Sequence, residues 1–365
     1  METKQRILWP DIAKGIGIIM VVFFHSIVSS LKTTPASQIV FALLQEIHMP
    51  LFFFVSGWLF ELKADRIEGS KGKAVWQKFL RLMVPYFVFS AIYYIATNIA
   101  LGIDSIGSVM QANGGYTRHS LGESVYQILT FDNINDDHLA VSLWFLYTLF
   151  IITVINILMP KFTKHPAFVA AIIPLCMIPR FFPGFFDHSE ALKLTLYYLF
   201  FFCLARLMFP RTDRVFSMKK SLFALVFLGY AVLSFAAVIV LDLNWYGINK
   251  ELAHHLYPIV REAAAVLGIL FFCTAANHIS SAKIARPLMF LGQKSMVIYL
   301  IHAPILTQAT VILFSKFMPG LPLIIYFLTG TIVGFAVPLL IDWLILSRVP
   351  ILNTALTGAT YRSKK

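Results

Sequence analysis

Residues 220–241 read KSLFALVFLGYAVLSFAAVIVL, and no charged side chain occurs between Lys220 and Asp242. A helix needs about 20 apolar residues to cross the ~30 Å hydrocarbon core of a bilayer, and this stretch is long enough. The strands of membrane barrels instead alternate between apolar and polar residues over about ten positions. The continuous apolar stretch therefore predicts a membrane-spanning α-helix.

The composition extends this prediction to the whole chain. Of the 365 residues, 58% are hydrophobic and only 13% are charged, whereas a soluble domain has about 25% charged residues. This chain has too little polar surface to coat a soluble particle, and the same numbers exclude disordered and disulfide-stapled proteins. The three cysteines lie singly in apolar runs, without the spacing of a metal or disulfide site.

Ten apolar stretches follow one another along the chain, and proline and glycine mark many of the connections between them. We expect an all-α integral membrane protein, a bundle of about ten transmembrane helices. Residues 1–365 are expected to form a single membrane domain with no appended soluble domain. The predicted spans are residues 8–30, 38–60, 76–101, 139–159, 166–182, 192–209, 220–241, 258–279, 286–314 and 321–347.

The positive charges fall in alternate connections. The N-terminus, the even-numbered connections and the C-terminal tail are rich in Lys and Arg, whereas the odd-numbered connections carry acidic residues such as Asp132, Asp136, Asp137 and Asp187. The positive-inside rule therefore predicts that both termini are cytoplasmic. The basic residues behind the net charge of +12 thus fall where the positive-inside rule places them, so no nucleic-acid partner is expected.

The first predicted span contains ionisable residues that a lipid-facing helix would exclude. Asp11 lies three residues before Lys14, within reach of an ion pair. Lys14 and His25 are eleven residues apart, which places both on one helix face with a rise of about 16 Å between them. Such groups are tolerated where they face a protein interior or a wet cavity. Snorkelling of Lys14 and simple packing of His25 are the structural alternatives.

The ninth predicted span has a similar polar face. Ser295, Tyr299 and His302 follow an i, i+4, i+7 spacing, and His302 reaches a depth close to that of His25. His302 is therefore a second candidate for the same site, with Tyr299 and Ser295 beside it. The alternative for Ser295 and Tyr299 is polar bonding between helices.

Further candidates lie in the second, third and fourth spans. His48 lies about 15 Å deep and is followed by Pro50, whose missing N–H leaves a carbonyl free, so we expect either a kink that faces a cavity or a kink alone. Ser56 lies about two helical turns after His48, and close packing of helices is the alternative for it. Arg81 lies within an apolar segment at the inner mouth, and Trp144 lies at the outer end of the fourth span.

These residues occur in an order and spacing that identify a family. A basic residue, ten intervening residues and a histidine in the first span are the most specific element. The matching positions are Lys14, His25, His48, Pro50, Ser56, Gly57, Arg81, Pro85, Tyr86, residues 143–146, Gly292, Ser295, Tyr299 and His302. Over nearly the whole chain, the sequence resembles acyltransferase family 3, the bacterial integral-membrane O-acyltransferases, and looks closest to the branch of fucose 4-O-acetylase-like sugar acetyltransferases.

The resemblance implies the reaction and its location. An acyl group, commonly acetyl, would move from cytoplasmic acyl-CoA to a hydroxyl of a cell-surface polysaccharide or its lipid-linked precursor, in the bacterial inner membrane. Acetyl-CoA is the expected donor substrate, and no metal is expected. Many members have arginine where this chain has Lys14. Lysine keeps the positive charge but cannot bind a phosphate in the bidentate geometry that arginine offers.

The resemblance also implies roles for the residues. His25 would act as the general base on the acceptor hydroxyl, with His302 and Tyr299 orienting it or stabilising the oxyanion. The donor phosphates would be held by Lys14 and Arg81, and Asp11 would orient Lys14. The remaining candidates for the substrate cavity are His48, Ser56, Ser295 and Trp144.

Two alternatives remain open from the sequence. A transporter or flippase of a glycan or small anion would also place Lys, Asp and His inside the membrane, although the chain shows no evident internal repeat. Within the enzyme hypothesis, a covalent acetyl intermediate on His25 is as compatible with the residues as direct transfer. Direct transfer is our hypothesis.

Overall fold

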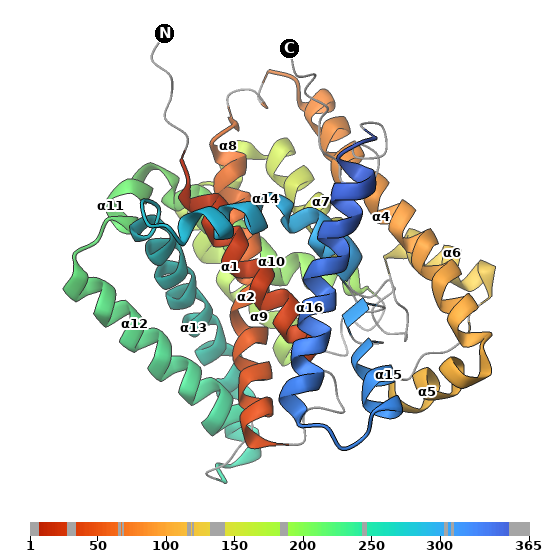
Figure 1. Ribbon diagram of the computed structural model, residues 1–365. Helices are drawn as coiled ribbons and strands as arrows, with labels where there is room; N and C mark the ends of the chain where they lie inside the picture. Colours follow the sequence, from red (N-terminus) through yellow and green to blue (C-terminus); the bar gives the residue numbers. More distant parts are fainter. Residues whose placement is uncertain are drawn as a thin grey trace.

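The computed structural model describes residues 7–27, 34–64, 67, 69–114, 118, 120–131, 143–182, 189–242, 247–302, 306–307 and 310–349, and no β-strand occurs among them (Figure 1). Every predicted span contains a helix, so the all-helical prediction is confirmed for this part of the chain. These helices are α1 (Trp9–Ser26), α2 (Pro35–Glu61), α4 (Lys71–Leu101), α7 (Trp144–Leu158), α9 (Pro166–Phe181), α10 (Glu190–Met208), α12 (Lys220–Phe235), α13 (Lys250–His278), α14 (Ala285–His302) and α16 (Leu323–Ile341).

Six of these helices are long and apolar enough to cross a bilayer, so the chain is a multi-pass membrane protein. They are α2, α4, α10, α12, α13 and α16, counted with the short helical turns that continue some of them. The helices α7 and α9 are apolar but shorter. Helices α1 and α14 contain the ionisable residues described above. The total of about ten spans stays a prediction.

Helix ends that the charge pattern assigns to one side of the membrane lie together. The Lys71 Nζ donates to the Leu158 carbonyl over 3.0 Å, and Asn277 Nδ2 donates to the Phe216 carbonyl over 3.0 Å. The start of α1 and the end of α16 lie at the same end of the bundle, at the top of Figure 1. This arrangement fits an even number of crossings. The N-terminal residues Lys4 and Arg6 and the acidic segment 132–137 lie outside the described residues.

Helix α1 lies in the middle of the bundle and packs against α14, α2, α16 and α13 (Figure 1). Its contact with α14 is a crossing of two backbones. A Cβ atom at Gly15 would lie 2.0 Å from the Leu288 carbonyl oxygen, and a Cβ atom at Gly292 would lie 1.8 Å from the Asp11 carbonyl oxygen. Only glycine allows this approach, so the two polar faces predicted from the sequence are held together.

The structure corrects the start of one predicted span and the end of another. Helix α13 begins at Lys250 rather than at residue 258, and Pro258 lies inside it, which membrane helices tolerate because their neighbours re-satisfy the freed carbonyl. The predicted ninth span ends at His302, two residues before Pro304, and a separate helix α15 (Thr310–Phe317) follows.

The structure also describes helices in the long third connection. This connection contains two short helices, α5 (Asp104–Gly114) and α6 (Leu121–Thr130). Helix α6 begins with a capping box between Ser120 and Glu123. The hydroxyl of Tyr86 on α4 donates to the carbonyl of Ile128 on α6 over 3.0 Å, which ties this connection to the bundle.

Candidate functional site

A cavity of about 1130 Å³ lies among α1, α2, α4, α7, α10 and α14. At the end formed by the connection from α2 to α4, basic side chains line its mouth, and no acidic residue lines the cavity in the described ranges. Lys78 lies close enough to Arg81 and Lys63 for their charges to repel one another. This mouth is therefore suited to an anion. Its basic residues are Lys14, Lys63, Lys73, Lys78 and Arg81.

The opposite end of the cavity is apolar and aromatic. It is lined by Val21, Met49, Phe52, Phe145 and Tyr299, which lie seven or more residues along their helices from the mouth. Each of three helices then carries a histidine within four residues: Val21 is followed by His25, Met49 is preceded by His48, and Tyr299 is followed by His302. The cavity thus ends about one helical turn, roughly 6 Å, short of a histidine cluster.

The closest contact in this cluster joins His25 and His302. The Nε2 atom of His302 lies 3.2 Å from the Nδ1 atom of His25. His25 Nδ1 also lies 2.9 Å from the Val21 carbonyl, and His302 Nδ1 lies 2.8 Å from the Ile298 carbonyl. A carbonyl oxygen only accepts, so these contacts place the proton on Nδ1 of both neutral rings.

This tautomer assignment gives the two histidines different capacities. The Nδ1–H group of His25 is shared between the Val21 carbonyl and the lone pair on His302 Nε2. The Nε2 atom of His25 then keeps a free lone pair and can accept a proton. His302 is fully buried, while His25 is half-buried. The geometry therefore allows His25 to act as a base and His302 to orient it and to stabilise its charged form.

His48 lies beside this pair without lining the cavity. Its ring stacks on Phe24 with 4.9 Å between centroids, and its Nδ1 donates to the Leu44 carbonyl. It lies close enough to His25 for their charges to interact. The side chain is buried, so a role in supporting the pair fits its position better than direct contact with a substrate.

The structure brings together most of the residues that the sequence singled out. Lys14, Arg81, Ser56, Ser295 and Tyr299 line the cavity. Asp11 reaches it through Lys14, because the Asp11 carboxylate lies 2.8 Å from Lys14 Nζ, the ion pair that their spacing predicted.

Trp144 does not belong to this cavity. Its ring stacks on Tyr198, with 5.2 Å between centroids, and on Phe53, with 6.3 Å. It does not contribute to the cavity lining. Trp144 therefore packs between helices at the start of α7, as its position at the predicted interface would allow.

Sequence reasoning missed part of the mouth. Lys73, Gln77 and Arg81 line the cavity together, and their i, i+4, i+8 spacing places them on one helix face. The signal was hidden because α4 begins at Lys71, five residues before the predicted span. Lys63 also lines the mouth, whereas its place in a basic connection predicted only the cytoplasmic side of the membrane.

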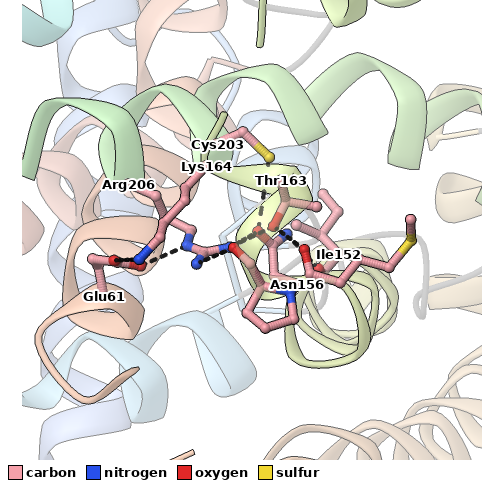
Figure 2. Close-up of polar contacts among 9 residues, drawn as sticks. Glu61, Ile152, Asn156, Thr163, Lys164, Cys203 and Arg206 are labelled. Carbon is pink, nitrogen blue, oxygen red and sulfur yellow. Dashed lines mark hydrogen bonds and ion pairs between the residues drawn. The ribbon is translucent and has the colours of Figure 1, made fainter. Parts of the chain in front are cut away.

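Arg206 has a different surrounding from the cations of the mouth (Figure 2). Its Nε donates to Glu61 over 2.7 Å, and its Nη1 donates to Asn156 over 2.7 Å and to Thr163 over 2.5 Å. Its Nη2 donates to the Pro160 carbonyl over 3.0 Å. The side chain is 2% exposed. This Arg206 cluster joins α2, α7, α10 and the short helix α8 (Pro160–Thr163). Its hydrogen bonds therefore hold these helices together.

The described residues contain no group of three or more His, Cys, Asp or Glu side chains placed to hold a metal ion. Cys176, Cys203 and Cys273 are buried free thiols on separate helices. The polar side chains that line the described cavity are those of lysine, arginine, glutamine, serine, threonine and tyrosine, and the histidine pair lies beyond its aromatic end.

Comparison with known families agrees with this arrangement. The sequence model of acyltransferase family 3, described as an acyltransferase domain, matches residues 7–343. The match covers nearly the whole chain, so the protein belongs to this family of membrane acyltransferases. Neither the curated proteins nor the solved structures gave a match.

Proposed function

We propose that the protein is an O-acetyltransferase of the fucose 4-O-acetylase-like branch. It would move an acetyl group from cytoplasmic acetyl-CoA to a hydroxyl of a cell-surface polysaccharide or its lipid-linked precursor. The observation that supports this most is a cavity with five cations at its mouth and a histidine pair about one turn beyond its aromatic end. The protein would act in the bacterial inner membrane as one domain, with both termini in the cytoplasm.

The cavity suits the two ends of acetyl-CoA. Phosphates form charge-assisted hydrogen bonds with lysine and arginine, and the cations of the mouth would hold them. Lys14 lies at the mouth and His25 lies eleven residues further along α1, a rise of about 16 Å. An extended pantetheine arm spans a comparable length, so the thioester would reach the aromatic end of the cavity.

The histidine pair would then transfer protons. His25 Nε2 takes the proton of the acceptor hydroxyl, and the acceptor oxygen attacks the thioester carbon. His302 accepts from the Nδ1–H group of His25 and so stabilises the imidazolium. The carbon–sulfur bond breaks, and the thiolate takes the proton from His25 to give free CoA. Tyr299 would donate to the oxyanion of the intermediate.

Acetyl-CoA turnover by the purified protein in nanodiscs tests this proposal. The assay supplies lipid-linked and surface glycans and measures free CoA and the acetyl ester. We expect His25→Ala to lower transfer by about 10²–10⁴-fold, the contribution of a positioned base. His255→Ala is the matched control, because His255 Nδ1 also donates to a carbonyl four residues earlier, over 2.7 Å, but is exposed. Glycan flux without release of CoA would instead support a transporter.

Direct transfer has its own test. Incubation with acetyl-CoA and no acceptor should leave His25 unmodified in intact-protein and peptide mass spectra. An acetyl group recovered on His25 would replace direct transfer with a two-step route through a covalent intermediate. The assignment of the protein as an acetyltransferase would stand in that case.

A further inference from the structure

The aromatic end of the cavity is built as a wall of rings. Phe52 and Phe145 lie 5.9 Å apart between centroids at an angle of 61°, and Phe145 and Tyr299 lie 5.5 Å apart at 69°. Both pairs have the edge-to-face geometry that aromatic rings favour. The wall joins three helices, α2, α7 and α14, and all three rings line the cavity.

The surroundings of this wall hold the rings in place. A Cβ atom at Gly17 would lie 2.9 Å from the Phe52 ring, so α1 supports that ring from behind. Phe53 backs Phe145 with 5.0 Å between their centroids. Phe145 and Tyr299 are each only 8% exposed. In a closely packed interior, such rings do not move aside without cost.

The rings lie at the end of the cavity that is nearest to His25. Val21 lines the end of the cavity and His25 follows it by four residues, which is about 6 Å along α1. The transferred acyl group and the acceptor hydroxyl must both fit near this point. An acetyl group adds one methyl beyond the reacting carbon, whereas a longer chain would need the space that the rings occupy.

We propose that Phe52 and Phe145 restrict the donor to short acyl groups by narrowing the aromatic end of the cavity beside the thioester. This inference rests on the proposed function, since it assigns the acyl end of the donor to the aromatic end of the cavity. The two phenylalanines are thus specificity-determining residues.

Binding of stable thioethers tests the restriction without requiring an acceptor. Calorimetry compares S-ethyl-CoA with S-hexyl-CoA on the protein in nanodiscs. The wild type should bind the ethyl compound at least about tenfold more tightly, since even one misplaced methylene in a closed pocket costs about 10–200-fold. Phe52→Leu and Phe145→Leu should each reduce this ratio to about threefold or less. Phe54→Leu is the control, because Phe54 is buried on the same helix and does not line the cavity.

The possible failures are distinguishable. Equal binding of both thioethers by the wild type, or an unchanged ratio in Phe52→Leu and Phe145→Leu, would overturn the restriction and leave the acetyltransferase standing. Absence of binding by either thioether to the wild type would overturn the proposed function as well. If Phe145→Leu is poorly folded, the half-buried Phe52 provides the test alone.

Discussion

Two regions of this bundle bury polar groups, and they do so in opposite ways. In the Arg206 cluster, one cation meets a carboxylate, an amide, a hydroxyl and a carbonyl, all within 2.5–3.0 Å (Figure 2). At the cavity mouth, five cations share one hollow that no acidic residue lines in the described ranges. In the first region the protein itself supplies the hydrogen-bond acceptors and the counter-charge of the cation, whereas the second region is suited to bind an anion.

The comparison distinguishes a charge whose partners all lie within the chain from charges that are suited to a ligand. A buried charge is tolerated when hydrogen bonds and a counter-charge surround it, and Arg206 meets that condition within the chain. At the mouth, Lys14 is paired with Asp11, but Lys78 lies where the charges of Arg81 and Lys63 repel it, an arrangement that an anionic ligand would stabilise. Both regions lie at the same end of the bundle, so the sign of the charge alone did not distinguish them.

The largest effect is expected at the histidine pair. His302→Phe removes the acceptor for the His25 Nδ1–H group and should lower kcat by about 10²–10⁴-fold, with the KM for acetyl-CoA nearly unchanged. His302→Gln keeps an amide oxygen that can accept and should recover part of the rate. Steady-state kinetics check both variants. Equal losses in the two would show that His302 acts only by filling space.

The next largest effect is a loss of stability when the Arg206 cluster is disrupted. Arg206→Met leaves Glu61 without its closest cation and should lower the free energy of unfolding by about 3–5 kcal/mol. Replacing Glu61 by Gln in the same protein should restore part of this loss. Lys164→Met is the control, since the Lys164–Glu61 pair is 3.4 Å long and Lys164 is 46% exposed, and such pairs contribute under about 1 kcal/mol. Thermal unfolding in detergent measures all three.

A smaller effect is expected at the crossing of α1 and α14. Gly292→Ala would place a Cβ atom 1.8 Å from the Asp11 carbonyl oxygen, so the helices must separate, at a cost of about 1–3 kcal/mol. Gly72→Ala has open space around it and should be neutral or stabilising. The two unfolding midpoints, measured side by side, check the prediction. Equal midpoints would contradict the close crossing.

The smallest effect is expected when one exposed cation of the cavity mouth is neutralised. Lys73 is exposed and lines the cavity, so Lys73→Gln should raise the KM for acetyl-CoA by about three- to fivefold with kcat unchanged. Added salt should shrink this difference, because it screens exposed charges. Lys161→Gln, on the same side of the bundle but outside the cavity, should leave KM unchanged. A fall in kcat for Lys73→Gln would place Lys73 elsewhere in the reaction.

Sequence patterns predicted the helices and much of the site, because both depend on periodicity within one segment. The spacing of Asp11, Lys14 and His25 is local, and the structure places Lys14 at the cavity and His25 just beyond it. The surroundings of Arg206 could not be predicted in this way, since its partner Glu61 is 145 residues away in the chain. The prediction of the cavity mouth was incomplete for a related reason. Lys63 and Lys73 flank the start of α4, which hydropathy alone placed five residues too late.

The glycine crossing of α1 and α14 also bears on the distance between the two histidine rings. His25 lies ten residues beyond Gly15, and His302 lies ten residues beyond Gly292, so the two helices form equal arms of about 15 Å each. A change of 5° in the angle between two such arms would shift one ring against the other by about 1.3 Å. That distance is enough to break the 3.2 Å contact between the rings. Two residues without side chains thus set the spacing of two histidine rings at the far end of their helices.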